Sequence, residues 1–254
     1  MSSFPSLPSL DCHAHIAPDV TRAQLDTLNG SIVLAVTRTP TEAESVVRRR
    51  DRGLIWGTGI HPGLPAALSA YDPDQFRRHL DQFALVGEVG LDRRGSVGRQ
   101  QDVFGSVLAA ASGYPVLISV HSAGRTNRVL DLIANDPHPG IILHWFLGSP
   151  EEIDRAVLLG CHFSVNAAMS EEAISRIPAH KMLPETDFPS SRSKTRARTP
   201  GDTDRLDLTI AALRGISTME VRDLWYRNFS ALVRAANVTS RLSTELQDVI
   251  AQMH

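Results

Sequence analysis

The feature that most constrains the fold of this chain is the regular alternation of short apolar, β-branched runs with segments of helical periodicity. Eight runs have the length and composition of buried strands, and they cover residues 10–16, 31–37, 54–61, 84–91, 116–121, 140–146, 162–166 and 182–188. Helices are expected between them, for example over 41–52 and 149–159, and two more, over 203–213 and 218–236, close the chain.

This order of elements predicts the fold class. Eight strands with intervening helices in 254 residues match the size and order of a (β/α)8 barrel, and a doubly wound open sheet is the alternative. No linker divides the chain, because the most polar stretch, 190–204, falls between the eighth strand and its helix. We therefore expect a single-domain α/β protein, a TIM barrel over residues 1–254 with its core at about 10–235.

Composition excludes several classes of protein. The formal net charge is -2, so no overall field attracts nucleic acid or acidic membranes, and an anionic partner must be bound by a local patch. Two cysteines, Cys12 and Cys161, cannot build a disulfide framework. The first ten residues lack the pattern of a secretory signal, and no apolar run reaches the roughly 18 to 20 residues of a membrane span. We expect a cytoplasmic protein that does not enter a membrane.

Histidine and carboxylate side chains gather at the C-terminal ends of the expected strands, which meet at one mouth in a barrel. Singly, each has an ordinary explanation as a hydrogen-bonded core residue or a helix cap. Together, four imidazoles and two carboxylates in one dry cavity are costly unless a cation binds them. We therefore expect a metal site built from His13, His15, Glu88, His121, His144 and Asp187.

The number of these side chains indicates two ions. A tetrahedral catalytic ion uses three protein ligands and keeps one open position, so six candidates exceed the need of one ion. A carboxylate is able to bridge, and Glu88 would then bind both ions, roughly 3.5 to 4 Å apart. Mixed imidazole and carboxylate ligands suit zinc, manganese or nickel, and also magnesium where waters complete its shell.

The motifs that carry these residues resemble those of the TatD family of metal-dependent hydrolases. The resemblance runs from about residue 10 to about residue 235 and implies a metallo-dependent hydrolase barrel with a divalent-metal phosphodiesterase site, usually a DNase. In chain order the family motifs D-x-H-x-H, G-[IV]-H-P, G-E-x-G-L-D, L-H-x-F, E-T-D-x-P and N-x-x-x-[LF] match residues 11–15, 59–62, 87–92, 143–146, 185–189 and 228–232.

The resemblance also implies a role for each site residue. The family's first metal site matches His13, His15, Glu88 and Asp187, and its second matches Glu88, His121 and His144. His61 matches a family histidine that lies near the substrate phosphate, so we expect His61 to bind substrate. Glu88 and Asp187 are the expected catalytic groups, with Asp187 orienting or deprotonating the attacking water while the ions neutralise charge on the phosphoryl oxygens. Asp11 and Asp92 are expected to support this site by hydrogen bonds.

The rim of the expected mouth departs from the family pattern. The residue after His144 is Trp145 where the family commonly has cysteine, and the loop after Asp187 carries four basic residues, Arg192, Lys194, Arg196 and Arg198. We predict that Arg196 and Arg198 bind backbone phosphates of the substrate. Trp145 has two explanations, since it would either stack on an unpaired base or pack in the barrel wall.

Three functions remain open at this point. A DNase or other phosphodiesterase acting on DNA or a related diester is favoured, because no strand-end lysine is present to form the carbamylated bridge of many amidohydrolases. A metal-dependent amidohydrolase acting on a small carbonyl substrate is the first alternative. The second is a nuclease-like subunit that works with partner proteins, since the altered rim resembles divergent TatD-like members of Qat-type anti-phage defence cassettes.

Overall fold

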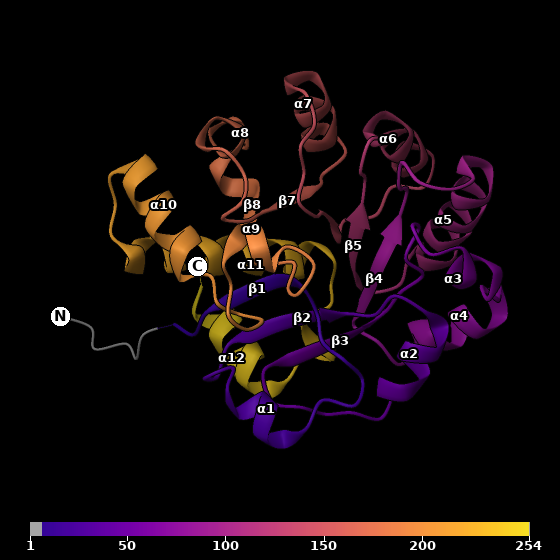
Figure 1. Cartoon of the computed structure of the whole chain (residues 1–254), viewed down its shortest axis with the longest axis horizontal. Coiled ribbons are helices and arrows are strands. Elements are labelled where there is room, and N and C mark those ends of the chain that lie inside the picture. Colours follow the sequence, from indigo (N-terminus) through magenta and orange to yellow (C-terminus); the bar gives the residue numbers. More distant parts are fainter. Residues whose placement is uncertain (1–6, 254) are drawn as a thin grey trace.

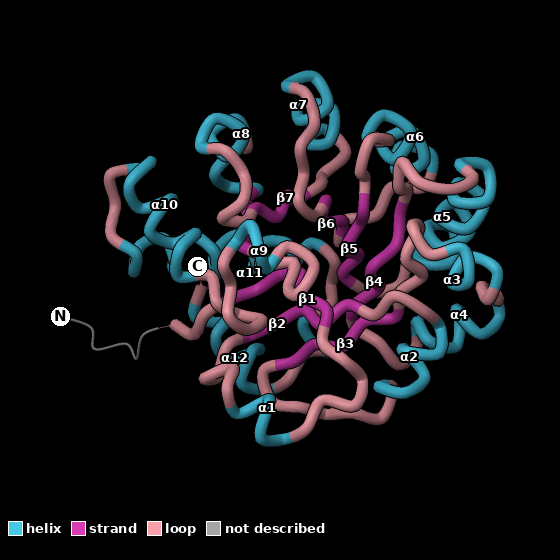
Figure 2. The backbone as a smooth tube through the Cα atoms, viewed as in Figure 1, coloured by secondary structure: helices cyan, strands magenta, loops and turns pink. Residues whose placement is uncertain are grey.

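In the computed structural model, which describes residues 7–253, the strands form one parallel sheet that curls into a barrel with the helices outside it (Figures 1 and 2). All eight expected strands are confirmed, and each lies within its predicted limits. They are Leu10–His15 (β1), Ile32–Val36 (β2), Leu54–Thr58 (β3), Leu85–Gly90 (β4), Leu117–His121 (β5), Ile141–Leu143 (β6), His162–Val165 (β7) and Met182–Pro184 (β8).

The residues that follow β8 close the barrel. Neighbouring strands pair in parallel from β1 to β8 in chain order. Beyond β8, the Asp187 backbone N–H donates to the His13 carbonyl at 2.9 Å, and the His15 N–H donates to the Phe188 carbonyl at 2.7 Å. These bonds join the last segment to the first strand, so the TIM barrel is confirmed and the open doubly wound sheet is excluded.

The helices follow their local signals with one notable exception. Ser149 and Ser217 each begin a helix with a reciprocal capping box. The helix expected over 41–52 ends at Val46, because Arg49 turns back to bind the Asp51 carboxylate and the Pro18 carbonyl. The α-helices are Arg22–Asp26 (α1), Pro40–Val46 (α2), Pro65–Ser69 (α3), Pro73–Leu80 (α4), Val97–Ala111 (α5), Thr126–Asn135 (α6), Pro150–Leu158 (α7), Glu171–Arg176 (α8), Arg192–Thr195 (α9), Asp204–Arg214 (α10), Thr218–Ala235 (α11) and Thr244–Gln252 (α12).

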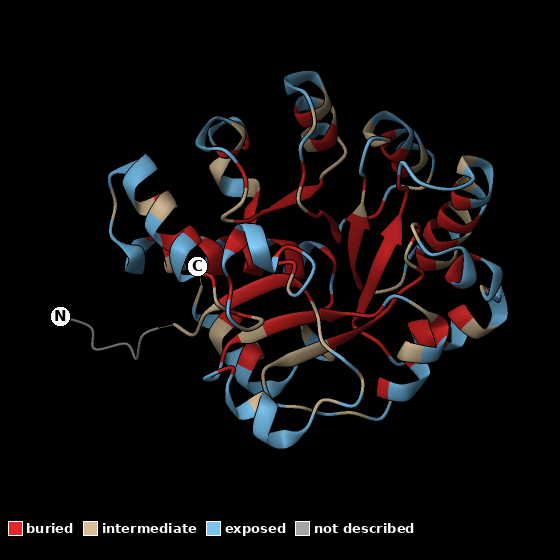
Figure 3. Cartoon of the chain, in the orientation of Figure 1, coloured by how far each residue is buried: buried red, intermediate tan, exposed pale blue. Residues whose placement is uncertain are grey.

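Alternation along the strands gives the barrel a polar interior and an apolar outer layer. The strands are almost wholly buried, whereas the helices expose their outer faces (Figure 3). The His13 ring nitrogen Nδ1 lies 2.7 Å from the Ser119 hydroxyl, and since β1 and β5 are not neighbours this bond crosses the barrel interior. Strand residues that alternate with these inward-facing ones point outward. Cys12 is one of them, and it belongs to the apolar core that includes Phe104 and Phe229 of the surrounding helices.

No helix within residues 7–253 is long and apolar enough to span a membrane. The expectation that the first ten residues carry no secretory signal falls partly on residues 1–6, which, like His254, lie outside the described part of the chain.

Asn228 links α11 to the start of β8 by hydrogen bonds. Its side-chain amide donates to the Ala179 carbonyl at 2.6 Å and to the Met182 carbonyl at 2.7 Å. Asn228→Ala leaves both carbonyls without this donor, so we expect the free energy of unfolding to fall by about 1–3 kcal/mol in urea titrations. Arg227→Ala, at the exposed neighbouring position, is the control, and an equal effect of both variants would contradict this role.

Candidate metal centre

The six expected metal ligands come together at the C-terminal mouth of the barrel, around the carboxylate of Glu88. The oxygen Oε2 of Glu88 lies 3.3 Å from His15 Nε2 and 3.9 Å from His13 Nε2. On the same side, Asp187 Oδ1 lies 3.7 Å from His15 Nε2 and 3.9 Å from His13 Nε2. His13, His15 and Glu88 thus offer ligand atoms close enough to hold one ion, and Asp187 lies beside the two imidazoles.

The other oxygen of Glu88 faces a second set of rings. Oε1 lies 2.6 Å from His121 Nδ1 and 2.9 Å from His144 Nε2, and these two ring nitrogens are 3.0 Å apart. His61 Nε2 lies 3.3 Å from Glu88 Oε2, so this histidine also reaches the centre. Glu88 is therefore shared by two groups of histidines.

The donor atoms of the first group fit a divalent ion. Ligands bound at about 2.1 Å to a tetrahedral ion lie about 3.4 Å apart, which is close to the 3.3–3.9 Å separations found here. His13 Nε2 and Glu88 Oε2 are buried and have no hydrogen-bond partner among residues 7–253. Such orphaned polar atoms are costly, and a cation between them removes that cost.

The buried carboxylates of the site also favour binding of a cation. Burial, together with the nearby carboxylates of Glu185 and Glu88, raises the pKa of Asp187 to about 9. Burial also raises the pKa of Glu88, but the facing rings of His121 and His144 outweigh it and hold that pKa well below its ordinary value. A divalent ion held there would allow Asp187 to ionise beside the other carboxylates.

Two glycines allow Glu88 to occupy its position. A Cβ atom on Gly59 would lie 1.9 Å from the Thr37 carbonyl oxygen and 2.5 Å from the Glu88 backbone nitrogen. Gly90 has a φ of +128°, and a Cβ atom there would lie 2.2 Å from the His121 carbonyl oxygen. The glycines of the G-[IV]-H-P and G-E-x-G-L-D motifs therefore permit close approach of the ends of β2, β3, β4 and β5.

Buried acceptors orient the rings and the loop of the site. Asp92 Oδ2 lies 2.9 Å from His121 Nε2, so the carboxylate holds the proton on that nitrogen and leaves Nδ1 free to bind an ion. Asp11, as expected, acts as a support, because it accepts hydrogen bonds from the Thr186 backbone N–H, the Thr186 hydroxyl and the Gly201 N–H. Asp92 also acts as a support, because it contacts His121 and its Oδ1 accepts from the Arg94 backbone N–H at 2.7 Å in the loop after β4.

Sequence reasoning missed two buried residues of the site. Ser119 contacts His13, and Glu185 accepts from the Ser164 hydroxyl and lies 3.8 Å from His144 Nδ1. Each stands two residues before a predicted ligand, Ser119 before His121 and Glu185 before Asp187. Period-two alternation places Ser119 on the same face of β5 as His121, and this signal could have identified it. Glu185 and Asp187 follow the end of β8 at Pro184, and Asp187 has a φ of +46°, so alternation does not identify Glu185.

Replacing Asp92 is expected to weaken metal binding. Asp92→Asn removes the negative charge that orients His121, so half-maximal activity should require about 10- to 100-fold more metal. Activity measured across a metal titration checks this. The control is Arg94→Gln, which removes the exposed partner of Asp92 and leaves the contact with His121. An unchanged metal requirement in the Asp92 variant would contradict the orienting role.

The structure places the three residues that were expected to bind substrate at different locations. His61 lies in the centre, whereas Arg196 is exposed at the end of α9 with a φ of +62°. Arg198 lies outside the centre. Among residues 7–253 it forms its ion pair with Asp202.

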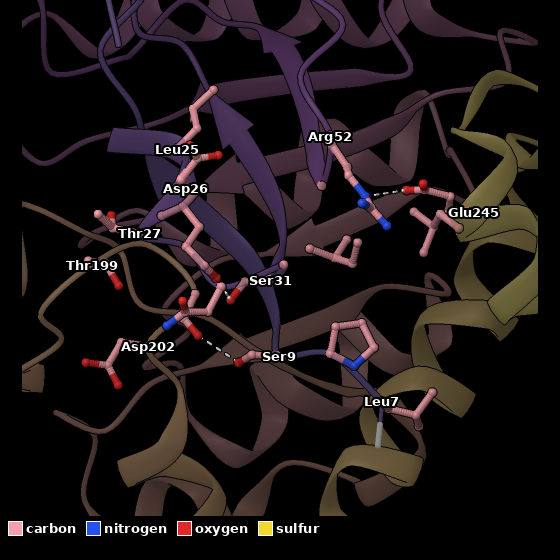
Figure 4. A pocket seen from close by; sticks show the side chains of 18 of the residues that line it. Leu7, Ser9, Leu25, Asp26, Thr27, Ser31, Arg52, Thr199, Asp202 and Glu245 are labelled. Atoms are coloured by element: carbon pink, nitrogen blue, oxygen red, sulfur yellow. Dashed lines mark hydrogen bonds and ion pairs between the residues drawn. The ribbon is translucent and has the colours of Figure 1, made fainter. Parts of the chain in front are cut away.

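Arg198 also lines a cavity of about 740 Å³ away from the ligand cluster. Ser9, Ser31 and Arg52 of the same wall stand at or before the N-terminal ends of β1, β2 and β3, opposite the mouth (Figure 4). An exposed arginine that already pairs with a carboxylate is a weak phosphate ligand, so this placement lends no support to substrate binding by Arg198.

Comparison with known proteins places the chain in a family. The TatD related DNase family matches residues 10–234. The human Deoxyribonuclease TATDN3 is 27% identical over 254 residues, which cover 86% of this chain and 92% of the relative. The 3'-5' ssDNA/RNA exonuclease TatD of Yersinia pseudotuberculosis is 28% identical over 178 residues, which cover 62% of this chain and 68% of the relative.

Solved structures agree on the fold. The crystal structure of YJJV, a TatD homologue of Escherichia coli K12, superposes with a TM-score of 0.73 at 20% identity and covers 87% of this chain and 97% of that one. A TatD family hydrolase of Entamoeba histolytica gives a TM-score of 0.69 at 15% identity, with 89% and 98% covered. With the family match spanning most of the chain and the ligand cluster in place, the protein belongs to the TatD related DNase family and is a metal-dependent hydrolase.

Proposed function

We propose that the protein is a two-metal phosphodiesterase that hydrolyses DNA. One observation carries this proposal: the two oxygens of Glu88 face two separate groups of imidazoles, which is the arrangement a bridging carboxylate requires. The first ion would be held by His13, His15, Glu88 and Asp187, and the second by Glu88, His121 and His144. The similarity to a human deoxyribonuclease and to a bacterial ssDNA/RNA exonuclease supports a nucleic-acid substrate.

The residues of the chain divide the chemistry between them. Bound ions would supply a hydroxide nucleophile near neutral pH and neutralise charge that develops on the phosphoryl oxygens. Asp187 directs Oδ1 toward His13 and His15, and its second oxygen is the proposed acceptor for a proton of the attacking water. Glu88 would contribute one oxygen to each of the two metal sites.

His61 is suited to donate a hydrogen bond to the substrate phosphate. Its Nδ1 accepts from the Gly63 backbone N–H at 2.9 Å, so a neutral ring carries its proton on Nε2, which points into the centre. Burial lowers the pKa of His61, which favours the neutral ring. An Nε2–H group donates to an anionic oxygen and does not ligate a metal, and this supports the predicted role in substrate binding.

Metal analysis combined with an activity assay tests the proposal. Purified protein should contain about two divalent ions per chain, and zinc and manganese suit its imidazole and carboxylate donors. It should cleave labelled single-stranded DNA and bis-p-nitrophenyl phosphate, and a chelator or His13→Ala should abolish both reactions. His180→Ala, at an exposed histidine, is the matched control. Bound metal without cleavage of either diester would overturn the proposal and favour an amidohydrolase acting on a small carbonyl substrate.

The anti-phage setting stays a prediction from the altered rim, as does the cytoplasmic location. If the chain works as a subunit of a defence complex, its native partner proteins should co-purify with it and increase cleavage of DNA. Full nuclease activity of the isolated chain, unchanged by those partners, would contradict the subunit role.

A further inference from the structure

Trp145 stands at the rim of the mouth in an unusual conformation. It directly follows His144, has a φ of +40°, and donates its backbone N–H to Glu185 Oε2 at 3.3 Å. A left-handed backbone is costly for a bulky residue and is kept where surrounding contacts enforce it. The bond to Glu185 ties the position of the indole to that of the adjacent His144.

Trp145 differs from the other two tryptophans of the chain. Trp56 and Trp225 are buried, at 6% and 1% exposure, and each donates its indole N–H to an aspartate. Trp145 is only half-buried, and its indole N–H makes no hydrogen bond with residues 7–253. Trp145 packs against the hydrophobic core with part of its ring, but unlike the other two tryptophans it leaves the rest of the ring accessible to a ligand.

A basic helix lies against this ring. The ammonium nitrogen of Lys194 in α9 is 5.5 Å from the centroid of the Trp145 ring. Arg192, Lys194 and Arg196 are exposed and take part in no ion pair among residues 7–253. The helix is tied to the site, because Ser191 donates to the Asp187 carbonyl through its N–H at 3.0 Å and through its hydroxyl at 3.1 Å.

We propose that Trp145 and Lys194 form a nucleotide subsite for single-stranded DNA beside the metal centre. The indole stacks on an unpaired base, and the Lys194 ammonium leaves the ring to bind the neighbouring backbone phosphate. A phosphate attracts the ammonium more strongly than an exposed aromatic face does, since the face offers only a weak cation–π contact. The subsite rests on the proposed function and extends it, by naming how an unpaired strand is held next to the reacting phosphate.

Fluorescence tests the stacking without requiring turnover. In the Asp187→Asn background with metal bound, a six-nucleotide single-stranded DNA should quench tryptophan emission, and the signal reports Trp145 because the other two tryptophans are buried. Adding Trp145→Phe should abolish the quenching. Quenching that persists in this double variant, or no quenching at saturating DNA, would overturn the proposal.

Kinetics test the subsite in the active enzyme. Trp145→Leu and Lys194→Ala should each raise the KM for single-stranded DNA about tenfold and leave kcat/KM for methyl p-nitrophenyl phosphate, which has no base and no second phosphate, within about twofold. Lys194→Ala should also lower the slope of log affinity against log salt concentration by about one. Arg214→Ala, an exposed basic residue at the end of α10, is the control.

The two proposals fail in different ways. Equal losses on DNA and on the small ester would mean that Trp145 merely supports the fold of the rim, and this result would overturn the subsite. If the wild-type protein cleaves neither diester, the phosphodiesterase proposal fails, while the quenching by DNA still decides whether the subsite exists.

Discussion

Replacing Glu88 by glutamine is expected to remove both bound metal and activity. Glutamine keeps the volume of the side chain but has one oxygen and no charge, so it cannot join the group around His15 to the group around His121. We expect cleavage of bis-p-nitrophenyl phosphate to fall on the order of 10³-fold, equivalent to about 4 kcal/mol of transition-state stabilisation. Metal content should fall from about two ions per chain to fewer than one.

A matched variant separates this effect from a general loss of charge. Glu245→Gln removes a carboxylate that pairs with Arg52 beside the cavity at the other end of the barrel, and it should leave metal content and turnover unchanged. Thermal unfolding of both variants without metal checks that the fold is retained. If the Glu88 variant misfolds, His15→Asn at the half-buried rim of the same cluster is the substitute. A folded Glu88 variant that keeps two ions would contradict the bridging role.

Asp187→Asn is expected to reduce turnover far more than substrate binding. An amide oxygen still ligates an ion weakly, but the side chain can no longer accept a proton from the attacking water. We expect kcat to fall by about 10²- to 10⁴-fold, with the KM for single-stranded DNA within about threefold of wild type. Steady-state kinetics at saturating metal measure both quantities, and unchanged turnover would exclude Asp187 as the catalytic base.

Stability measurements give this variant an internal check. In the absence of metal, Asp187 lies among the carboxylates of Asp11, Glu88 and Glu185, so asparagine removes a group that resists ionisation there. The metal-free variant should therefore unfold at the same temperature as wild type or higher. Asp19→Asn, at an exposed position of the loop after β1, is the control and should change neither kcat nor the unfolding temperature. A destabilised, inactive Asp187 variant would instead indicate a structural role.

Much of the fold and of the ligand cluster could be predicted from local sequence. Each strand is a short buried run, so its existence depends on residues that are adjacent in the chain. His13 and His15 share a face because a strand alternates with period two, and the parallel order of the strands brings their ends to one mouth. The same rule places Ser119 on the face of His121, whereas Glu185 lies beyond the end of β8 and only the structure revealed it as a partner of this site.

The rim could not be predicted in the same way. Arg196 and Arg198 are neighbours of Lys194 in sequence, yet Arg198 pairs with Asp202 on the wall of another cavity while Lys194 lies over the ring of Trp145. Loop side chains have no period that fixes their direction, so their partners depend on how the loop packs against distant strands. The left-handed backbone at Trp145 likewise depends on Glu185, forty residues away.

The sequence by itself determined the order of eight strands and the set of imidazoles and carboxylates carried to one end of a barrel. These features follow from local periodicity and from side-chain chemistry, which need no partner to be recognised. Only the tertiary structure decided that Glu88 directs its two oxygens to different groups of histidines, that Asp92 orients His121, and that Lys194 covers Trp145. Such contacts join residues distant in the chain, and their geometry exists only when the barrel has closed.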